Sequence, residues 1–126
     1  MKKLVAFCLL LVGCSQAEEK ISEELQTKVL ELHDVLMPKT EQIVSLKSKL
    51  DSLSTGADST HVRKLISSLD KADKSMMDWM HQFSIDSLEK MDVGTKVIYL
   101  KKQYTQLTDL QKLTDSTLNA AQKYRP

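Results

Sequence analysis

The chain has 126 residues, with 18 basic and 17 acidic side chains and a formal net charge of +1. This length fits one domain, and the few glycine, proline and aromatic residues favour helices over a β-sandwich. Because the basic residues are not clustered, the sequence argues against nucleic acid or an anionic bilayer surface as a partner.

The first residues have the layout of a secretory signal. Met1–Lys3 supplies positive charge. The apolar stretch that follows is roughly nine residues long, whereas a membrane-spanning helix needs ~20. Leu11-Val12-Gly13-Cys14 comes next and resembles the lipobox of bacterial lipoproteins. The resemblance implies that residues 1–13 are removed as a signal peptide and that Cys14 receives a diacylglycerol thioether, becoming the acylated N-terminus.

The cysteine count agrees with this interpretation. The chain has two cysteines: Cys8 lies in the predicted signal and Cys14 at the predicted lipid site, so the mature domain is expected to lack thiol chemistry and disulfides. The alternative is a secreted protein with a free N-terminal cysteine. Two or three acyl chains, at ~0.8 kcal/mol per buried CH₂, make a stable anchor in the lipid bilayer.

Residues 14–21 are predicted to form the acylated N-terminus and a tether. Glu18 and Glu19 look like the export signals of some Gram-negative lipoproteins, although a solvated acidic tether is an equal interpretation. The expected location is the bacterial cell envelope, with the protein lipid-anchored at the outer membrane on its periplasmic or surface face.

The helical domain is predicted to span residues 22–126. Ser22 is the expected N-cap of the first helix, with acidic residues in the first turn. Apolar residues then recur at steps of four and three, as in a coiled coil. They are Leu25, Val29, Leu32, Leu36, Ile43, Leu46, Leu50 and Leu53. Pro38 is expected to kink this helix, and a break into two helices is the alternative.

Further helices are predicted at about 60–83 and 95–123, separated from the first by the turn at 54–60. Residues 84–94 are less regular and are expected to include a short helical turn. Short connections between three amphipathic helices favour an all-α, up-down-up antiparallel three-helix bundle with coiled-coil-like packing.

Three polar residues fall near the middle of these helices. Lys39 occupies the seam position that is not apolar, Asp73 interrupts the second helix and Gln111 the third. They are predicted to meet as a polar layer of the core that fixes the register of the bundle. The alternative is that Lys39 extends outward to solvent.

Two motifs carry the strongest resemblance to known proteins. They are His33-Asp34-Val35-Leu36-Met37-Pro38 and Met76-Met77-Asp78-Trp79-Met80-His81-Gln82-Phe83. Together they resemble a family of small helical lipoproteins of Gram-negative bacteria, sometimes labelled after viral A-type inclusion proteins. This resemblance implies a helical fold and an envelope location but no activity.

The same motifs suggest a metal site. If the chain turns near Ala57, His33 faces His81 and Met37 faces Met77. Imidazole and thioether groups together form a donor set that suits Cu(I). The alternative is that the methionines fill gaps in the core and that Trp79 is a packing anchor. No other cofactor is predicted.

No catalytic set is predicted. Adjacent residues on a helix point about 100° apart, so Asp34 is not expected to orient His33. The sequence has no recognisable nucleophile triad, phosphate loop or zinc spacing, and a narrow bundle leaves little room for an active-site pocket. The predicted function is therefore a structural or protein-interaction module, which binds an envelope protein or itself. The alternative is a lipoprotein that binds Cu(I) or a small ligand.

Overall fold

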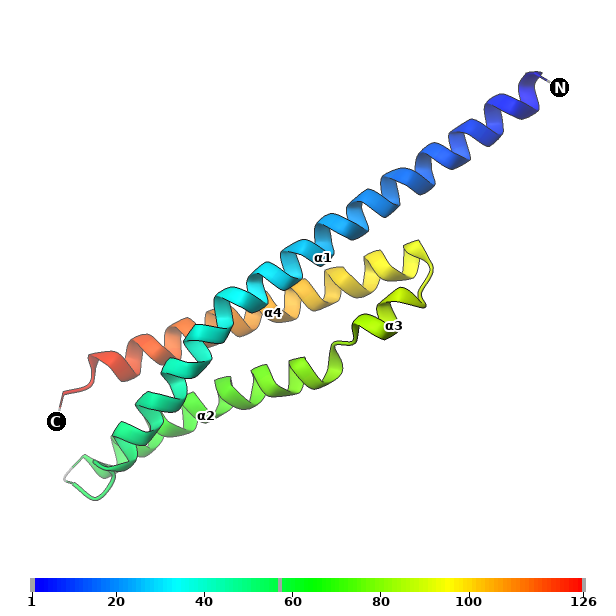
Figure 1. Cartoon of the computed structure of the whole chain (residues 1–126). Coiled ribbons are helices and arrows are strands. Elements are labelled where there is room, and N and C mark those ends of the chain that lie inside the picture. The colour runs from blue at the N-terminus through cyan, green and yellow to red at the C-terminus, as the bar shows by residue number, and fades with distance from the viewer. Residues whose placement is uncertain (1, 57, 126) are drawn as a thin grey trace.

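The computed structural model describes residues 2–56 and 58–125, with side chains from residue 16 onward. The chain is all-helical, as the composition predicted, and these ranges contain no strand. Its helices are α1 (Lys2–Asp51), α2 (Ser59–Gln82), α3 (Ile85–Glu89) and α4 (Val93–Lys123). The three long helices pack against one another in every pairing, most extensively α1 against α4 (Figure 1). None of the helices in the described ranges has the length and apolarity needed to cross a membrane.

Helix α1 is longer than expected. The predicted start at Ser22 is wrong, because α1 begins at Lys2 and Ser22 is an interior residue with only 5% of its surface exposed. Residues 15–21 contain neither glycine nor proline and include alanine, glutamate and lysine, which favour helix. Since extending an existing helix is much easier than nucleating one, nothing in this segment ends α1.

Pro38 does not divide α1. The helix is continuous through this residue, so the alternative of two separate helices is wrong. Proline removes one backbone donor but leaves the remaining hydrogen bonds of the helix in place. Leu36 and Ile43, each 1% exposed, bury α1 on both sides of the proline and hold the two parts in one helix.

The connection between α2 and α4 contains the predicted short helical turn as α3. The Ser84 hydroxyl caps α3 by accepting a hydrogen bond from the Ser87 amide at 3.1 Å. Asp92 caps α4 in the same way, through the Thr95 amide at 2.8 Å, so α4 begins slightly before the predicted residue. This backbone hydrogen bond lowers the pKa of Asp92 below its ordinary value.

The core consists of two groups of buried side chains along the bundle. The α3-side cluster lies toward the α3–α4 connection and contains Val29, Leu36, Met76, Trp79, Leu88, Leu100, Leu107 and Leu110. The turn-side cluster lies toward the α1–α2 turn and contains Ile43, Leu50, Val62, Leu65, Leu69, Ala72, Leu118 and Ala121. The predicted heptad seam of α1 thus supplies buried residues to both clusters.

Candidate functional site

The predicted lipidation site lies on α1, before the part of this helix that packs in the bundle. Residue 14 belongs to the helix, but the Cys14 side chain is outside the side chains that the structure describes. Acylation of Cys14 therefore stays a prediction.

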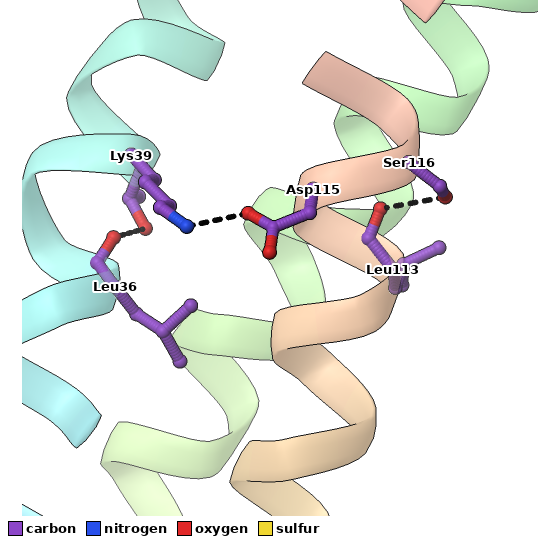
Figure 2. A network of polar contacts seen from close by, with 6 residues as sticks. Leu36, Lys39, Leu113, Asp115 and Ser116 are labelled. Atoms are coloured by element: carbon purple, nitrogen blue, oxygen red, sulfur yellow. Dashed lines mark hydrogen bonds and ion pairs between the residues drawn. The ribbon is translucent and has the colours of Figure 1, made fainter. Parts of the chain in front are cut away.

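Lys39 is paired across the bundle with an acidic residue of α4. Figure 2 shows its side chain extending toward Asp115, with 2.5 Å between Nζ and Oδ1. The side chains are 30% and 51% exposed, so this ion pair lies at the edge of the core. Lys39 thus leaves the seam sideways, toward a neighbouring helix.

Asp73 is paired at a different level. Its carboxylate lies 4.0 Å from Nζ of Lys47, which also contacts Asp70. The hydrogen bond that Lys47 donates to Asp70, together with the charges of both carboxylates, raises the pKa of Lys47. Because Lys47 is eight residues beyond Lys39, the two lysines are separated by about 12 Å along α1.

The predicted polar layer is therefore not assembled from the expected residues. No hydrogen bond or ion pair joins Lys39, Asp73 and Gln111 in the described part of the chain, and Gln111 is half-buried. Gln103 and Thr117 are instead buried on α4, each 5% exposed, and the Gln103 Oε1 has no hydrogen-bond partner. Residue 103 continues the spacing between Leu100 and Leu107, and this signal was available in the sequence.

His33 lies beside Trp79. The ring centroids are 5.9 Å apart, which places this half of the first motif against the second. The His33 Nδ1 is also 3.2 Å from Oδ1 of Asp34. The expectation that Asp34 does not orient His33 is therefore wrong, because the two side chains bend toward each other despite their divergent starting directions.

The other predicted metal donors are on a different face. Met77 is 46% exposed and His81 is also exposed, and the two line a shallow hollow with Asp70, Asp73, Lys74 and Asp78. On α2, His81 and Trp79 are two residues apart and point about 200° from each other. His81 therefore faces away from His33, and Met37 packs against the α3-side cluster. Within the described residues, no three His, Cys, Asp or Glu side chains are placed to hold a metal ion.

The two motifs instead build an aromatic stack across the bundle. Trp79 and Phe83 stack with centroids 4.9 Å apart and an interplanar angle of 12°. Phe83 continues the stack to Tyr99 of α4, at 6.1 Å and 15°. With His33 on the other side of Trp79, the stack connects α1, α2 and α4. This arrangement agrees with Trp79 being a packing anchor.

An apolar hollow lies over one side of this stack. Leu30, Met80 and Ile85 form its exposed rim and are 36%, 39% and 45% exposed. The rings of His33, Trp79 and Phe83 complete its lining. This hollow has the composition of a surface that contacts another apolar group.

No protein-family model matches the chain, and no curated protein or solved structure matches it either.

Proposed function

We propose that the protein is a lipid-anchored structural or protein-interaction module of the bacterial envelope. The observation that supports this proposal is the tetrapeptide Leu11-Val12-Gly13-Cys14, placed directly behind a positive and an apolar segment. The acyl chains on Cys14 anchor the protein in the bilayer, at the outer membrane on its periplasmic or surface face. The proposal includes membership in the small helical lipoprotein family that the two motifs resemble, and it assigns the protein no catalytic role.

The proposed architecture is an up-down-up antiparallel three-helix bundle with a first helix that bends at Pro38. Pairwise packing of α1, α2 and α4 supports it, as does the position of α3 within the connection between α2 and α4. Loss of the Pro38 amide donor supports a local bend.

The proposed contact surface is the apolar hollow rimmed by Leu30, Met80 and Ile85. Its rim exposes three large apolar side chains above rings that are stacked and therefore hold a fixed shape. Burying such side chains against a partner removes apolar surface from water, at about 25 cal/mol per Å². The partner is another envelope protein or a second copy of the chain.

The anchor is tested by intact-mass analysis of the membrane form. The expected species begins at residue 14 and carries the mass of a diacylglycerol and an amide-linked acyl chain. A Cys14→Ser variant is the control and should carry no lipid. Surface proteolysis of intact cells then reports on which side of the outer membrane the bundle lies. A wild-type protein without lipid, or with another N-terminus, would contradict the proposal.

The contact surface is tested by cross-linking in envelopes and by sedimentation of the purified lipoprotein in detergent. Leu30→Ser and Met80→Ser should weaken the cross-linked complex. Val44→Ser is a matched control, because Val44 is 55% exposed and does not line the hollow. A wild-type protein that is monomeric and forms no cross-link would count against an interaction role.

A further inference from the structure

The helix that bears Cys14 runs without interruption into the bundle. No glycine or proline lies between Cys14 and Ser22, the residue at which α1 becomes buried. These eight residues of helix span about 12 Å, whereas an extended tether of the same length would reach more than twice as far. A lipid on Cys14 would therefore hold the bundle close to the bilayer and in a defined orientation.

The direction of the helices determines which end of the bundle is close. Figure 1 shows α1 and α4 running in the same direction, with the first part of α1 projecting past the α3–α4 connection. The Lys39–Asp115 pair sets their relative register. Counting back 17 residues from Lys39 and from Asp115 reaches Ser22 and Ile98, so Ile98 also lies about 12 Å from the level of Cys14.

Exposed apolar side chains are concentrated toward the same end. The large hydrophobic residues that remain exposed are Ile21, Leu30, Val35, Val44, Met77, Met80, Ile85, Ile98 and Tyr104. All nine precede residue 45 of α1, follow residue 76 of α2, lie in α3 or precede residue 105 of α4. Ile98 is the most exposed of them, at 73%, and Ile21 is 43% exposed. Among the described side chains, the half nearer the α1–α2 turn exposes none of this size.

We propose that the α3–α4 end of the bundle lies against zwitterionic phospholipid headgroups, with Ile21 and Ile98 as its apolar contacts. This inference rests on the proposed acylation of Cys14. A headgroup layer is about 5 to 8 Å thick, so a spacer of about 12 Å brings this end of the bundle to its outer boundary.

The charges at this end favour a zwitterionic surface. Residues 84–102 carry four lysines and three acidic residues. The neighbouring part of α1 adds Glu18, Glu19, Glu23 and Glu24, which are exposed and would be repelled by anionic lipid. Isoleucine contacts together with this mixed charge match the alternating charges of phosphatidylcholine or phosphatidylethanolamine.

The test measures distance from the headgroups at two points on α4. Removal of residues 1–13 and acylation of Cys14 leave the mature protein without a free thiol, so an introduced cysteine is labelled uniquely. Ile98→Cys marks the proposed contact, and Asn119→Cys marks an exposed site about 31 Å further along the same helix. Each labelled lipoprotein is reconstituted in phosphatidylcholine vesicles that contain lipid with a nitroxide on its headgroup.

We expect the label at residue 98 to lose most of its fluorescence and the label at residue 119 to keep it. A further variant, Ala17→Gly with Glu18→Gly, loosens the helical connection and should reduce the difference while leaving the helical circular dichroism unchanged. Equal fluorescence at both sites in acylated, vesicle-bound protein would overturn the inference. A disulfide between two copies of the unlabelled Ile98→Cys variant, without quenching of the labelled one, would also overturn it, in favour of a chain-to-chain contact. Absence of the acyl mass together with loss of vesicle binding would instead contradict the proposed function.

Discussion

Lys39 and Lys47 differ in the acidic residues that face them, although both are half-buried on α1. Lys39 faces Asp115, whose side chain is 51% exposed and stays well hydrated without a partner. Lys47 faces Asp70 and also Asp73, whose side chain is only 24% exposed. The consequence of removing each lysine therefore depends on the carboxylate that is left behind.

Replacing these lysines by leucine should have opposite effects. Lys39→Leu loses an ion pair worth less than about 1 kcal/mol and adds apolar contact to the seam, so we expect up to about 1 kcal/mol of added stability. Lys47→Leu leaves Asp73 without a cation and should cost about 1 kcal/mol. Urea unfolding of each variant against wild type provides the measurement. A loss of stability in Lys39→Leu that matches the loss in Lys47→Leu would show that Lys39 does fix the register.

Lys47 also predicts how stability depends on alkaline pH. Its pKa is raised in the folded protein by the hydrogen bond to Asp70 and by nearby carboxylates, so the folded state holds this proton more tightly than the unfolded state. The resulting stability is fully present below a pH of about 10.4 and is lost as pH rises through the folded pKa. The free energy of unfolding should therefore fall more steeply above this pH in wild type than in Lys47→Met. Equal slopes would contradict the effect, and Tyr124, whose pKa is also raised, contributes equally to both proteins.

Gln103 introduces a polar group into the packed face of α4 without a partner for its Oε1. Because a buried acceptor that lacks a hydrogen bond costs roughly 1 to 3 kcal/mol, Gln103→Leu should raise the free energy of unfolding by about 1 kcal/mol. Gln111→Leu is the matched control, since Gln111 is only half-buried and its replacement should change stability by less than about 0.5 kcal/mol. Chemical denaturation distinguishes the two. Destabilisation by Gln103→Leu would indicate that a water molecule satisfies this oxygen.

At the scale of the helix, Pro38 is an exposed defect in α1 that the surrounding packing tolerates. Pro38→Ala restores one backbone donor and a better helix former, worth about 3 kcal/mol in a helix interior. The more flexible unfolded chain offsets about 0.4 to 1 kcal/mol of this gain. We therefore expect a net stabilisation of about 2 kcal/mol by thermal or urea unfolding.

Gln42→Ala is the control for this helix, because it is an exposed site on α1 where no donor is missing. Its effect should stay within about 0.5 kcal/mol. If Pro38→Ala were no more stabilising than this control, α1 would already compensate for the missing donor by bending.

The sequence predicted the helices and the seam well because their signals are local. Apolar spacing identified Val29, Leu36, Ile43 and Leu50, which are all buried. The start of α1 was wrong because Ser22 has a capping side chain but no helix-breaking residue precedes it. Capping chemistry is therefore a weak signal inside a continuous run of helix formers.

The candidate sites were less predictable because they depend on which way each helix faces. Matching residue numbers across the turn placed the two motifs at the same level, and His33 does lie beside Trp79. Level does not determine face, and His81 points away from His33. The partners of Lys39 and Asp73 likewise depend on the rotation and register of three helices, which no single spacing in the sequence provides.

At the scale of the whole molecule, the two core clusters share all three long helices, so they should unfold together. Trp79 is the chain's one tryptophan and belongs to the α3-side cluster, so its fluorescence reports on that half alone. Leu69 is fully buried in the turn-side cluster, and Leu69→Ala should cost about 2 to 5 kcal/mol. In a two-state molecule, this remote change lowers the midpoint of the Trp79 transition as much as that of the helical circular dichroism. A Trp79 transition that keeps its wild-type midpoint while the circular dichroism becomes biphasic would show that the clusters are independent folding units. Leu107→Ala is the matched control, because it removes the same side chain from the α3-side cluster and should shift both signals in either case.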